Sequence, residues 1–328
     1  NVEGLVTHDR AKRDDKVGRT LTTIMYILRK KLGFNAEYVV LNAANFGVPQ
    51  YRKRVYIVGC KKKFGSVNLK FKNTDEIPVE SCIQYGLPTI SNDFSKKLLQ
   101  HFSLTELNGK ALKDKRGGKS NIHSWEFDYK GVTTEDEKAL LNALLLARRK
   151  RKWAEEIGIT WMDGMPLTTT QIRTFFDHPK LQKMLDNLTK KKYLVYEYPK
   201  KQVIKTDDSG NRYTERIPDK TKEKGYNIVT GKLSFEISSF LDKSKPAKTI
   251  VAMDMGNIGI VEKDGIRHIS LREGLRLFGF PEDYSLEIFE KNKKDVKLGY
   301  DLIGNSVCVP VIKAVALRLL DKIRPQKK

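Results

Sequence analysis

The first 60 residues restrict the fold most strongly, because a helical pattern is followed at once by two strand-like segments. Apolar residues recur at helical spacing at Leu21, Ile24, Met25, Leu28 and Leu32. This spacing predicts an amphipathic helix over residues 19–32, and Gly33 supplies the stop. Residues 36–41 and 54–59 are rich in Val, Ile and Tyr, which is typical of strands. Residues 1–60 are therefore predicted to be α/β.

Between residues 61 and 232 the chain becomes lysine-rich and irregular, with isolated helical segments. A helix is predicted over residues 135–149, acidic at its start and basic at its end, as the helix dipole favours. Two short helices within residues 168–188 precede a strand over 193–198 and a turn at 207–210. Helix, turn, helix and hairpin is the order of a winged helix. Helix pairs followed by hairpins also occur as plain structure, so both interpretations stay open.

The chain then returns to short apolar segments and amphipathic helices. Strands are predicted over residues 249–253 and 259–262, and Ser270 with Glu273 forms the capping pattern of a helix start. Residues 310–323 begin with a proline and place apolar residues on one helical face, at Ile312, Val315, Leu319 and Ile323. We expect this last helix to pack on a core.

The net charge favours a polyanionic partner. The chain has 62 Lys+Arg against 40 Asp+Glu, a formal charge of +22, and basic side chains that neutralise phosphates release counterions. Nucleic acid is therefore the leading candidate. The lysine runs at residues 61–63 and 190–192, taken singly, are better explained as solvated surface, so the prediction depends on the global excess.

Cysteine usage and hydropathy exclude other classes. No apolar run approaches the roughly 18 residues that a membrane span needs, which predicts a soluble protein. Cys60, Cys82 and Cys308 are far apart and form neither a disulfide framework nor a metal-binding pair. This usage fits a reducing compartment, and no metal is expected.

Four local sequences occur in an order that resembles one enzyme family. They are N-V-E-G-L at residues 1–5, N-A-A-N-F-G-V-P-Q-Y-R-K-R at 42–54, L-R-E-G-L-R-L-F-G-F-P at 271–281 and G-N-S-V at 304–307. Together they resemble the rear part of the C5-cytosine DNA methyltransferases, in which E-N-V, F-G-V-P-Q-x-R-x-R, R-E-x-x-R-x-x-G-F-P and G-N-S-V follow in that order. A variable target-recognition region separates the second from the third.

The resemblance implies a fold, an activity and a domain plan. Residues 1–60 and 281–328 are expected to form the rear part of a doubly wound, Rossmann-like α/β domain. Residues 61–280 are expected to form an α+β target-recognition domain. The implied activity is methyl transfer from S-adenosylmethionine to C5 of a flipped cytosine in double-stranded DNA, in a restriction–modification system. We expect a cytoplasmic, nucleoid-associated bacterial protein.

Parts of the family pattern are not in this sequence. The Gly-rich loop that holds the cofactor and the Pro-Cys motif of the nucleophile do not occur, since none of the three cysteines follows a proline. The chain opens at Asn1, without the glutamate of E-N-V and without a Met. We therefore expect an N-terminal half, as a separate chain or an upstream segment, to supply the nucleophile, and we expect poor solubility without it.

The resemblance also implies site residues. Arg52 and Arg54 lie two apart on a predicted strand, so both point to one side as a pair of fork-shaped donors. In the family, the position of Arg54 donates to O2 of the flipped cytosine, while that of Arg52 contacts the DNA backbone or braces the site. Asn1 belongs to the E-N-V motif and is counted with the catalytic set. The cofactor-binding residues are expected to be Asn305, Ser306 and Val307.

Candidate DNA contacts lie in both predicted domains. The resemblance places Gln50, Arg52 and Thr249 near the DNA, although a β-branched pair at 249–250 is also ordinary in a strand. In the recognition region, basic or amide side chains suited to groove contact are Arg148, Arg149, Gln171 and Arg173. Residues 113–125 form a polar, basic segment that is either a DNA-contacting loop or a solvated one. The residues from 271 to 281 are predicted to be structural.

Two alternatives remain. A catalytically silent DNA-binding specificity chain is favoured by the missing motifs but not by the retention of Arg52, Arg54, Asn305 and Ser306. The second alternative is the tRNA-methylating branch of the same family, which the long lysine-rich recognition region suits less well.

Overall fold

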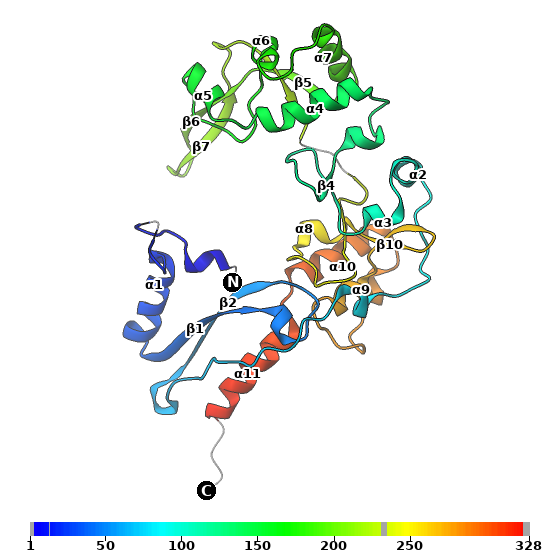
Figure 1. The fold of residues 1–328 in the computed structure, drawn as a ribbon. Helices are drawn as coiled ribbons and strands as arrows, with labels where there is room; N and C mark the ends of the chain where they lie inside the picture. The colour runs from blue at the N-terminus through cyan, green and yellow to red at the C-terminus, as the bar shows by residue number, and fades with distance from the viewer. Residues whose placement is uncertain (1–2, 13, 231–234, 324–328) are drawn as a thin grey trace. The chain divides into compact units, whose positions relative to one another are not determined.

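The computed structural model describes residues 3–12, 14–230 and 235–323, which divide into two compact units (Figure 1). Unit 1 combines the chain up to Thr89 with the chain from Phe240 onward, and unit 2 is Ile90–Ser239. These boundaries differ from the expected ones at residues 60 and 280. The reason is packing: Val79 and Leu241 are buried in the same hydrophobic cluster as Leu41.

In unit 1, a hairpin lies between two helices. Strands β1 (Phe34–Asn42) and β2 (Lys53–Lys61) pair antiparallel, with Leu41 opposite Arg54. Helix α1 (Arg19–Tyr26) continues as a π-helical turn, Ile27–Lys31, before Gly33 in the left-handed region at φ 70°. Leu21 packs with Ala36 on one hairpin face, and Val58 packs toward helix α11 (Val309–Ile323) on the other. The predicted helix and both strands are confirmed here.

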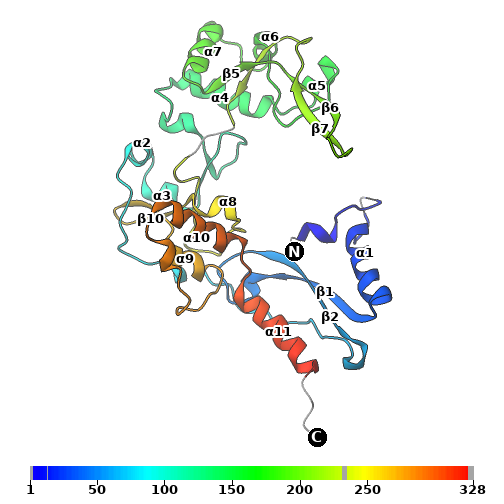
Figure 2. The same cartoon turned by 180° about the vertical axis from the view of Figure 1, so that it is seen from behind.

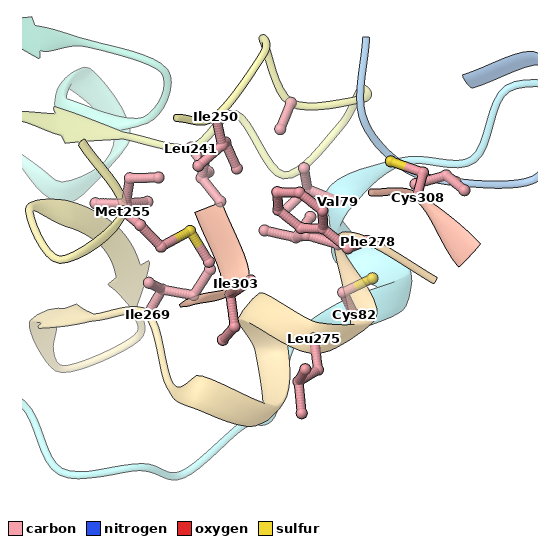
Figure 3. Close-up of a cluster of buried hydrophobic side chains, with 14 of the residues drawn as sticks. Val79, Cys82, Leu241, Ile250, Met255, Ile269, Leu275, Phe278, Ile303 and Cys308 are labelled. Carbon is pink, nitrogen blue, oxygen red and sulfur yellow. The ribbon is translucent and has the colours of Figure 1, made fainter. Parts of the chain in front are cut away.

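The remainder of unit 1 surrounds a large apolar cluster (Figure 3). Figure 3 shows Val79, Ile250, Phe278 and Ile303, which come from separate segments of the chain, among the buried side chains of this cluster. The secondary structure around the cluster comprises α8 (Ala252–Met255), β10 (Ile258–Glu262), β11 (Gly265–His268), α9 (Leu271–Arg276) and α10 (Lys293–Asn305). Short 3-10 turns are Glu3–Val6, Ala43–Phe46, Lys62–Phe64, Val79–Cys82 and Glu287–Phe289.

Two expectations for this part of the chain need correction. The predicted strand over 249–253 is wrong, because α8 begins at Ala252 and the preceding residues are extended without forming a strand. Helix α11 exists as expected, but Ile312 and Ile323 are exposed, and Val311 instead is buried. Among the described residues, no single helix is long and apolar enough to cross a membrane. Helices α10 and α11, taken together as a bent pair, have the length and composition of a membrane span, and this is by length and composition alone.

Unit 2 is built on a second hydrophobic cluster around Trp125, Leu144 and Leu185, and most of its helices and strands are labelled in Figure 2. Its helices are α2 (Asp93–His101), α3 (Leu104–Leu107), α4 (Glu135–Ala147), α5 (Lys152–Ile157), α6 (Thr169–Arg173) and α7 (Leu181–Lys190), with a 3-10 turn at Ser124–Phe127. Its strands are β3 (Ala111–Leu112), β4 (Asn121–Ile122), β5 (Leu194–Glu197), β6 (Lys200–Thr206), β7 (Arg212–Pro218) and β8 (Gly225–Ile228), and β9 (Ser239–Phe240) pairs with β3.

The winged-helix order is not reproduced. Strand β5 follows α7 as predicted, but it pairs antiparallel with β8, and the turn at 207–210 joins β6 to β7. Pro199 separates β5 from β6 and cannot donate a backbone hydrogen bond that would continue a ladder. Residues 113–125 are solvated only in part: Lys115, Arg116, Lys119 and Ser120 are exposed, whereas Asp114, Ser124 and Trp125 are buried.

Candidate active site

The loop before β2 is fixed by backbone bonds to a segment about 200 residues away. The amide of Tyr51 donates to the carbonyl of Ala247 at 2.7 Å, and the amide of Ala247 donates to Pro49 at 2.9 Å. Gly47 lies in the left-handed region at φ 72°, which favours glycine at the turn into this loop. The loop therefore enters β2 in a fixed position.

Gln50 serves this anchoring and is not on the surface. Its side chain is fully buried; Nε2 donates to the carbonyl of Leu277 at 2.9 Å, and Oε1 accepts from the amide of Ile250 at 3.2 Å. Both ends of the amide are thus used inside unit 1. The expectation that Gln50 contacts DNA is not met, because its side chain has no exposed surface and has a structural role here.

Arg52 joins two distant backbone segments, one at Ile250 and the other at residues 304–306. Its Nη1 donates to the carbonyl of Ile250 at 2.5 Å, and its Nη2 to those of Gly304 and Ser306 at 3.3 and 3.1 Å. The guanidinium lies 4.9 Å from the ring centroid of Phe278 and is 7% exposed. Burial, followed by the charge of Arg54, lowers the pKa of Arg52. Of the two roles expected for Arg52, this geometry matches bracing of the site. The buried guanidinium is not placed to contact the DNA backbone.

Arg54 differs from Arg52 in exposure and in partners. Its side chain is half-buried, and Nη1 donates to the carbonyl of the adjacent Lys53 at 2.8 Å. Both arginines act electrostatically on Cys308 and Tyr56, so they lie in one neighbourhood, as the two-residue spacing predicts. Thr249 is exposed beside this loop and donates to the carbonyl of Tyr51 at 2.6 Å. Arg54 is thus the guanidinium of the pair that has an accessible surface.

The expected cofactor residues lie between α10 and α11. Asn305 ends α10 and is exposed, Ser306 donates to the carbonyl of Ile303 at 2.6 Å, and Val307 is 51% exposed. An exposed amide and an exposed apolar side chain on one short turn are suited to a ligand with polar and apolar parts. The turn is fixed because the Ser306 carbonyl accepts from Arg52.

A close backbone approach at Gly304 brings this turn to Arg52. A Cβ added to Gly304 would lie 2.4 Å from Cα of Ala252 and 2.5 Å from its amide nitrogen. Real Cβ atoms do not approach backbone so closely, so only glycine fits without movement. Gly304 therefore allows α10 to pack directly against the segment at 251–252.

The segment from 271 to 281 is structural, as predicted. The Glu273 carboxylate is fully buried and accepts from Arg267 at 2.7 and 2.8 Å and from the amides of Gln84 and Ser270 at 2.8 Å. Arg272 donates to the carbonyl of Tyr284, and Arg276 pairs with Glu282. Sequence reasoning missed Arg267, although a lone arginine in a short apolar strand is a signal for a buried ion pair.

In unit 2, the four expected DNA contacts are occupied internally. Arg148 is 2% exposed and donates to Asn227 and to the carbonyl of Lys115. Arg149 and Arg173 pair with Asp163 and Asp177, respectively. Gln171 completes the capping box of α6 and donates to Glu156. Burial of Arg148 contradicts its DNA role, while the others have carboxylate or capping partners that DNA would have to replace.

The remaining candidates offer no nucleophile or metal site. Asn1 lies outside the described residues. All three cysteines are buried, and burial raises the pKa of Cys82 and of Cys308 to about 11, so neither is poised as a thiolate. In the described ranges, no group of three or more His, Cys, Asp or Glu side chains is placed to hold a metal.

The chain belongs to the C-5 cytosine-specific DNA methylase family, whose model matches residues 1–321. It is 53% identical over 320 residues to the type II methyltransferase M.NlaIV of Neisseria lactamica and 50% identical to M.NgoBV of Neisseria gonorrhoeae. Each match covers 98% of this chain and 71% of the relative. Members of this family use S-adenosylmethionine as the methyl donor.

A solved structure with a similar chain is the methyltransferase EhMeth of Entamoeba histolytica. It is 12% identical with a TM-score of 0.37, and the match covers 94% of this chain and 60% of that one. The chain therefore spans less than two thirds of this structural relative.

Proposed function

We propose that this chain is the base-binding and DNA-recognition part of a type II restriction–modification DNA (cytosine-5) methyltransferase. The observation that carries the proposal is the difference between the two arginines at the start of β2. Arg52 is buried and braces the site, whereas Arg54, two residues further on, has an accessible guanidinium. The relatives at 53% and 50% identity are type II methyltransferases, which supports the same activity.

In this proposal, Arg54 binds the target base. C5 and C6 of cytosine cannot be attacked inside the stacked duplex, so the base must be flipped out. Nucleophilic addition of a thiolate at C6 pushes electron density into the ring, and a guanidinium on O2 stabilises that charge. The methyl group would pass from the sulfonium sulfur of bound S-adenosylmethionine to C5, leaving S-adenosylhomocysteine, and loss of the C5 proton to a base with β-elimination would then release the thiolate. Arg54 supplies the donor, and Arg52 is a positioning residue.

The residues between α10 and α11 are proposed to hold the methyl donor. Asn305 offers an amide and Val307 an apolar surface, while the Ser306 hydroxyl caps the end of α10. S-adenosylmethionine supplies the transferable methyl group when bound. Because Arg52 donates to the carbonyl of Ser306, the cofactor turn and the base-binding loop share one anchor.

The nucleophile is proposed to lie on a segment outside these 328 residues, either on the same polypeptide or on a partner chain. The three cysteines are buried and lack the Pro-Cys pattern. The exposed apolar residues of α11, which include Leu317 at 46% and Leu320 at 37%, suit coverage by that segment. The Neisseria relatives extend beyond the matched region, since 71% of each is covered.

A methyl-transfer assay on duplex DNA tests this function. The chain is combined with the segment that carries the Pro-Cys motif, and the Arg54→Ala variant is compared with Lys53→Gln, which removes one adjacent positive charge. We expect Arg54→Ala to lower kcat by about 100-fold or more, as loss of a transition-state donor does, and Lys53→Gln to have little effect. Equal activity of both variants would contradict the role of Arg54. Sequence-selective binding without any transfer would instead establish a specificity chain.

A further inference from the structure

Strands β6 and β7 form a ribbon whose two faces differ in charge. Lys200 pairs with Pro218, Gln202 with Arg216, Ile204 with Thr214 and Thr206 with Arg212. The turn is stabilised by Asp207, whose carboxylate accepts from the amides of Ser209 and Asn211. Seven residues per strand give a ribbon of roughly 20 Å, labelled at the edge of unit 2 in Figures 1 and 2.

One face of the ribbon neutralises its own charge. Lys205 and Glu215 form an ion pair at 2.5 Å, and Lys201 pairs with Asp219 at 3.3 Å. Val203 and Ile217 on the same face are half-buried. Since both of its lysines have carboxylate partners, this face has little free charge for a polyanion.

The opposite face, here named the arginine face, consists of Lys200, Gln202, Ile204, Thr206, Arg212, Thr214, Arg216 and Pro218. All eight residues are exposed, and Ile204 is 74% exposed. The face carries three positive charges and no carboxylate, and within the part of the chain that the structure describes no ion pair involves them. A surface that combines unpaired cations, amide and hydroxyl groups and an exposed aliphatic side chain is complementary to DNA.

The base of the arginine face opens onto a cavity of unit 2. Lys200 and Arg216 line this cavity of about 520 Å³, together with Arg148, Glu197 and Asn227. Arg148 is 2% exposed, and its Nε is buried without a hydrogen-bond partner. Lys200 and Arg216 thus lie where the exposed ribbon meets a cavity whose lining includes the carboxylates of Asp163 and Glu197 as well as buried Arg148.

We propose that the arginine face enters the major groove of the target duplex and reads its bases, a proposal that rests on the proposed function in DNA methylation. A major groove about 12 Å wide admits a two-stranded ribbon. Arginine donates two hydrogen bonds to O6 and N7 of guanine, glutamine pairs with adenine, and an aliphatic side chain contacts the thymine methyl. Arg212, Arg216, Gln202 and Ile204 supply these groups from one exposed face.

Two faces of one ribbon provide a matched test with the enzyme that includes its Pro-Cys segment. Arg212→Gln and Arg216→Gln each remove one positive charge from the arginine face, and Lys205→Gln removes one from the opposite face. The parent enzyme first selects bound duplexes from a randomised DNA pool, which defines its site whether or not methylation occurs. Dissociation constants are then measured on the selected duplex and on unrelated DNA, and thermal unfolding checks that each variant is folded.

We expect the two arginine variants to lose about 10- to 100-fold in affinity for the selected duplex and much less for unrelated DNA, because a bidentate base contact is lost. Lys205→Gln should lower the affinity for both duplexes slightly and to the same extent. Replacing guanine by 7-deazaguanine, which lacks N7, should lower the affinity of the parent enzyme for the selected duplex. The same replacement should not lower further the affinity of the variant, Arg216→Gln or Arg212→Gln, whose arginine contacted that guanine. Equal effects of all three variants, or sensitivity only to groups in the minor groove, would overturn the proposal.

The assay separates this proposal from the proposed function. If the parent methylates DNA but the arginine variants bind the selected duplex normally, the ribbon assignment fails and the enzyme function stands. If the parent never transfers a methyl group but the arginine variants lose selective binding, the ribbon reads DNA and the enzymatic function fails.

Discussion

The start of β2 in unit 1 and the β6–β7 ribbon in unit 2 both present arginines, but in opposite environments. Arg52 is buried, and its guanidinium donates to three carbonyls, whereas Arg212 and Arg216 are exposed on a ribbon face without carboxylates. The first arrangement stabilises a fold, and the second leaves charge available to a partner. Net charge therefore does not separate arginines that stabilise the fold from arginines that are free to contact a partner, whereas burial and internal partners do.

The largest effect is expected at the buried Arg267–Glu273 pair. Glu273→Ala would leave Arg267 with Glu262 as its remaining carboxylate partner, and breaking a buried ion pair costs about 3–5 kcal/mol. The matched change on the ribbon, Glu215→Ala, breaks a half-exposed pair with Lys205 and should cost less than about 1 kcal/mol. Urea unfolding of both variants measures the difference, and equal stabilities would refute the contrast between the regions.

Arg52→Ala should rank next, with a loss of about 2–4 kcal/mol. Three carbonyls, on Ile250, Gly304 and Ser306, would lose their guanidinium donor in a buried site. Arg216→Ala, a surface change, should alter stability by about 0.5 kcal/mol or less. Chemical denaturation followed by circular dichroism, which reports on both units, checks both values. A destabilised Arg216→Ala beside a stable Arg52→Ala would reverse our assignment of the two arginines.

Gly304→Ala should destabilise unit 1 by about 1–3 kcal/mol, because the new Cβ would overlap the backbone of Ala252. Gly210→Ala is the control in the ribbon turn, where no atom lies near the added Cβ but φ is +82°. Its smaller cost would reflect backbone strain alone. Thermal unfolding compares the two, and an unperturbed Gly304→Ala protein would show that α10 does not depend on this approach.

The smallest effect concerns thiol labelling at pH 8. Burial raises the pKa of Cys308 to about 11, so about 0.1% is thiolate, against about a quarter for a free thiol of pKa about 8.5. Because only the thiolate reacts, iodoacetamide should modify Cys308 slowly in the native protein. Ser209→Cys in the exposed ribbon turn should react rapidly. Mass spectrometry at timed intervals follows both sites, and rapid native modification of Cys308 would contradict its burial.

Locally encoded elements were predictable from the sequence. The capping box at Ser270 forms as expected, and helix α4 and strands β1 and β2 lie where their patterns indicated. These elements depend on side-chain spacing and on caps within a few residues of each other. The predicted segments 135–149 and 54–59 needed no knowledge of distant partners.

The fate of individual polar residues was not predictable in the same way. The partners of Arg52 lie about 200 to 250 residues further along the chain, so the local pattern Q-Y-R-K-R does not tell buried Arg52 from accessible Arg54. Residues 249–253 form a continuous run of β-branched and apolar residues, yet α8 begins at Ala252, against the backbone of Gly304. The pairing of β5 was not predicted for a related reason: its partner is β8, which follows the inserted β6–β7 ribbon in the sequence.

That insertion has a consequence for how such proteins diversify. Glu197 and Gly225 pair at the ends of β5 and β8, and the ribbon leaves and re-enters unit 2 between these two fixed points. Gly225 lies so close to the backbone of Leu167 that the return point is held firmly. Exposed residues of the ribbon can therefore be exchanged by mutation or recombination while the scaffold stays intact. Such an arrangement is modular: new sequence preferences can evolve without renewed selection for folding.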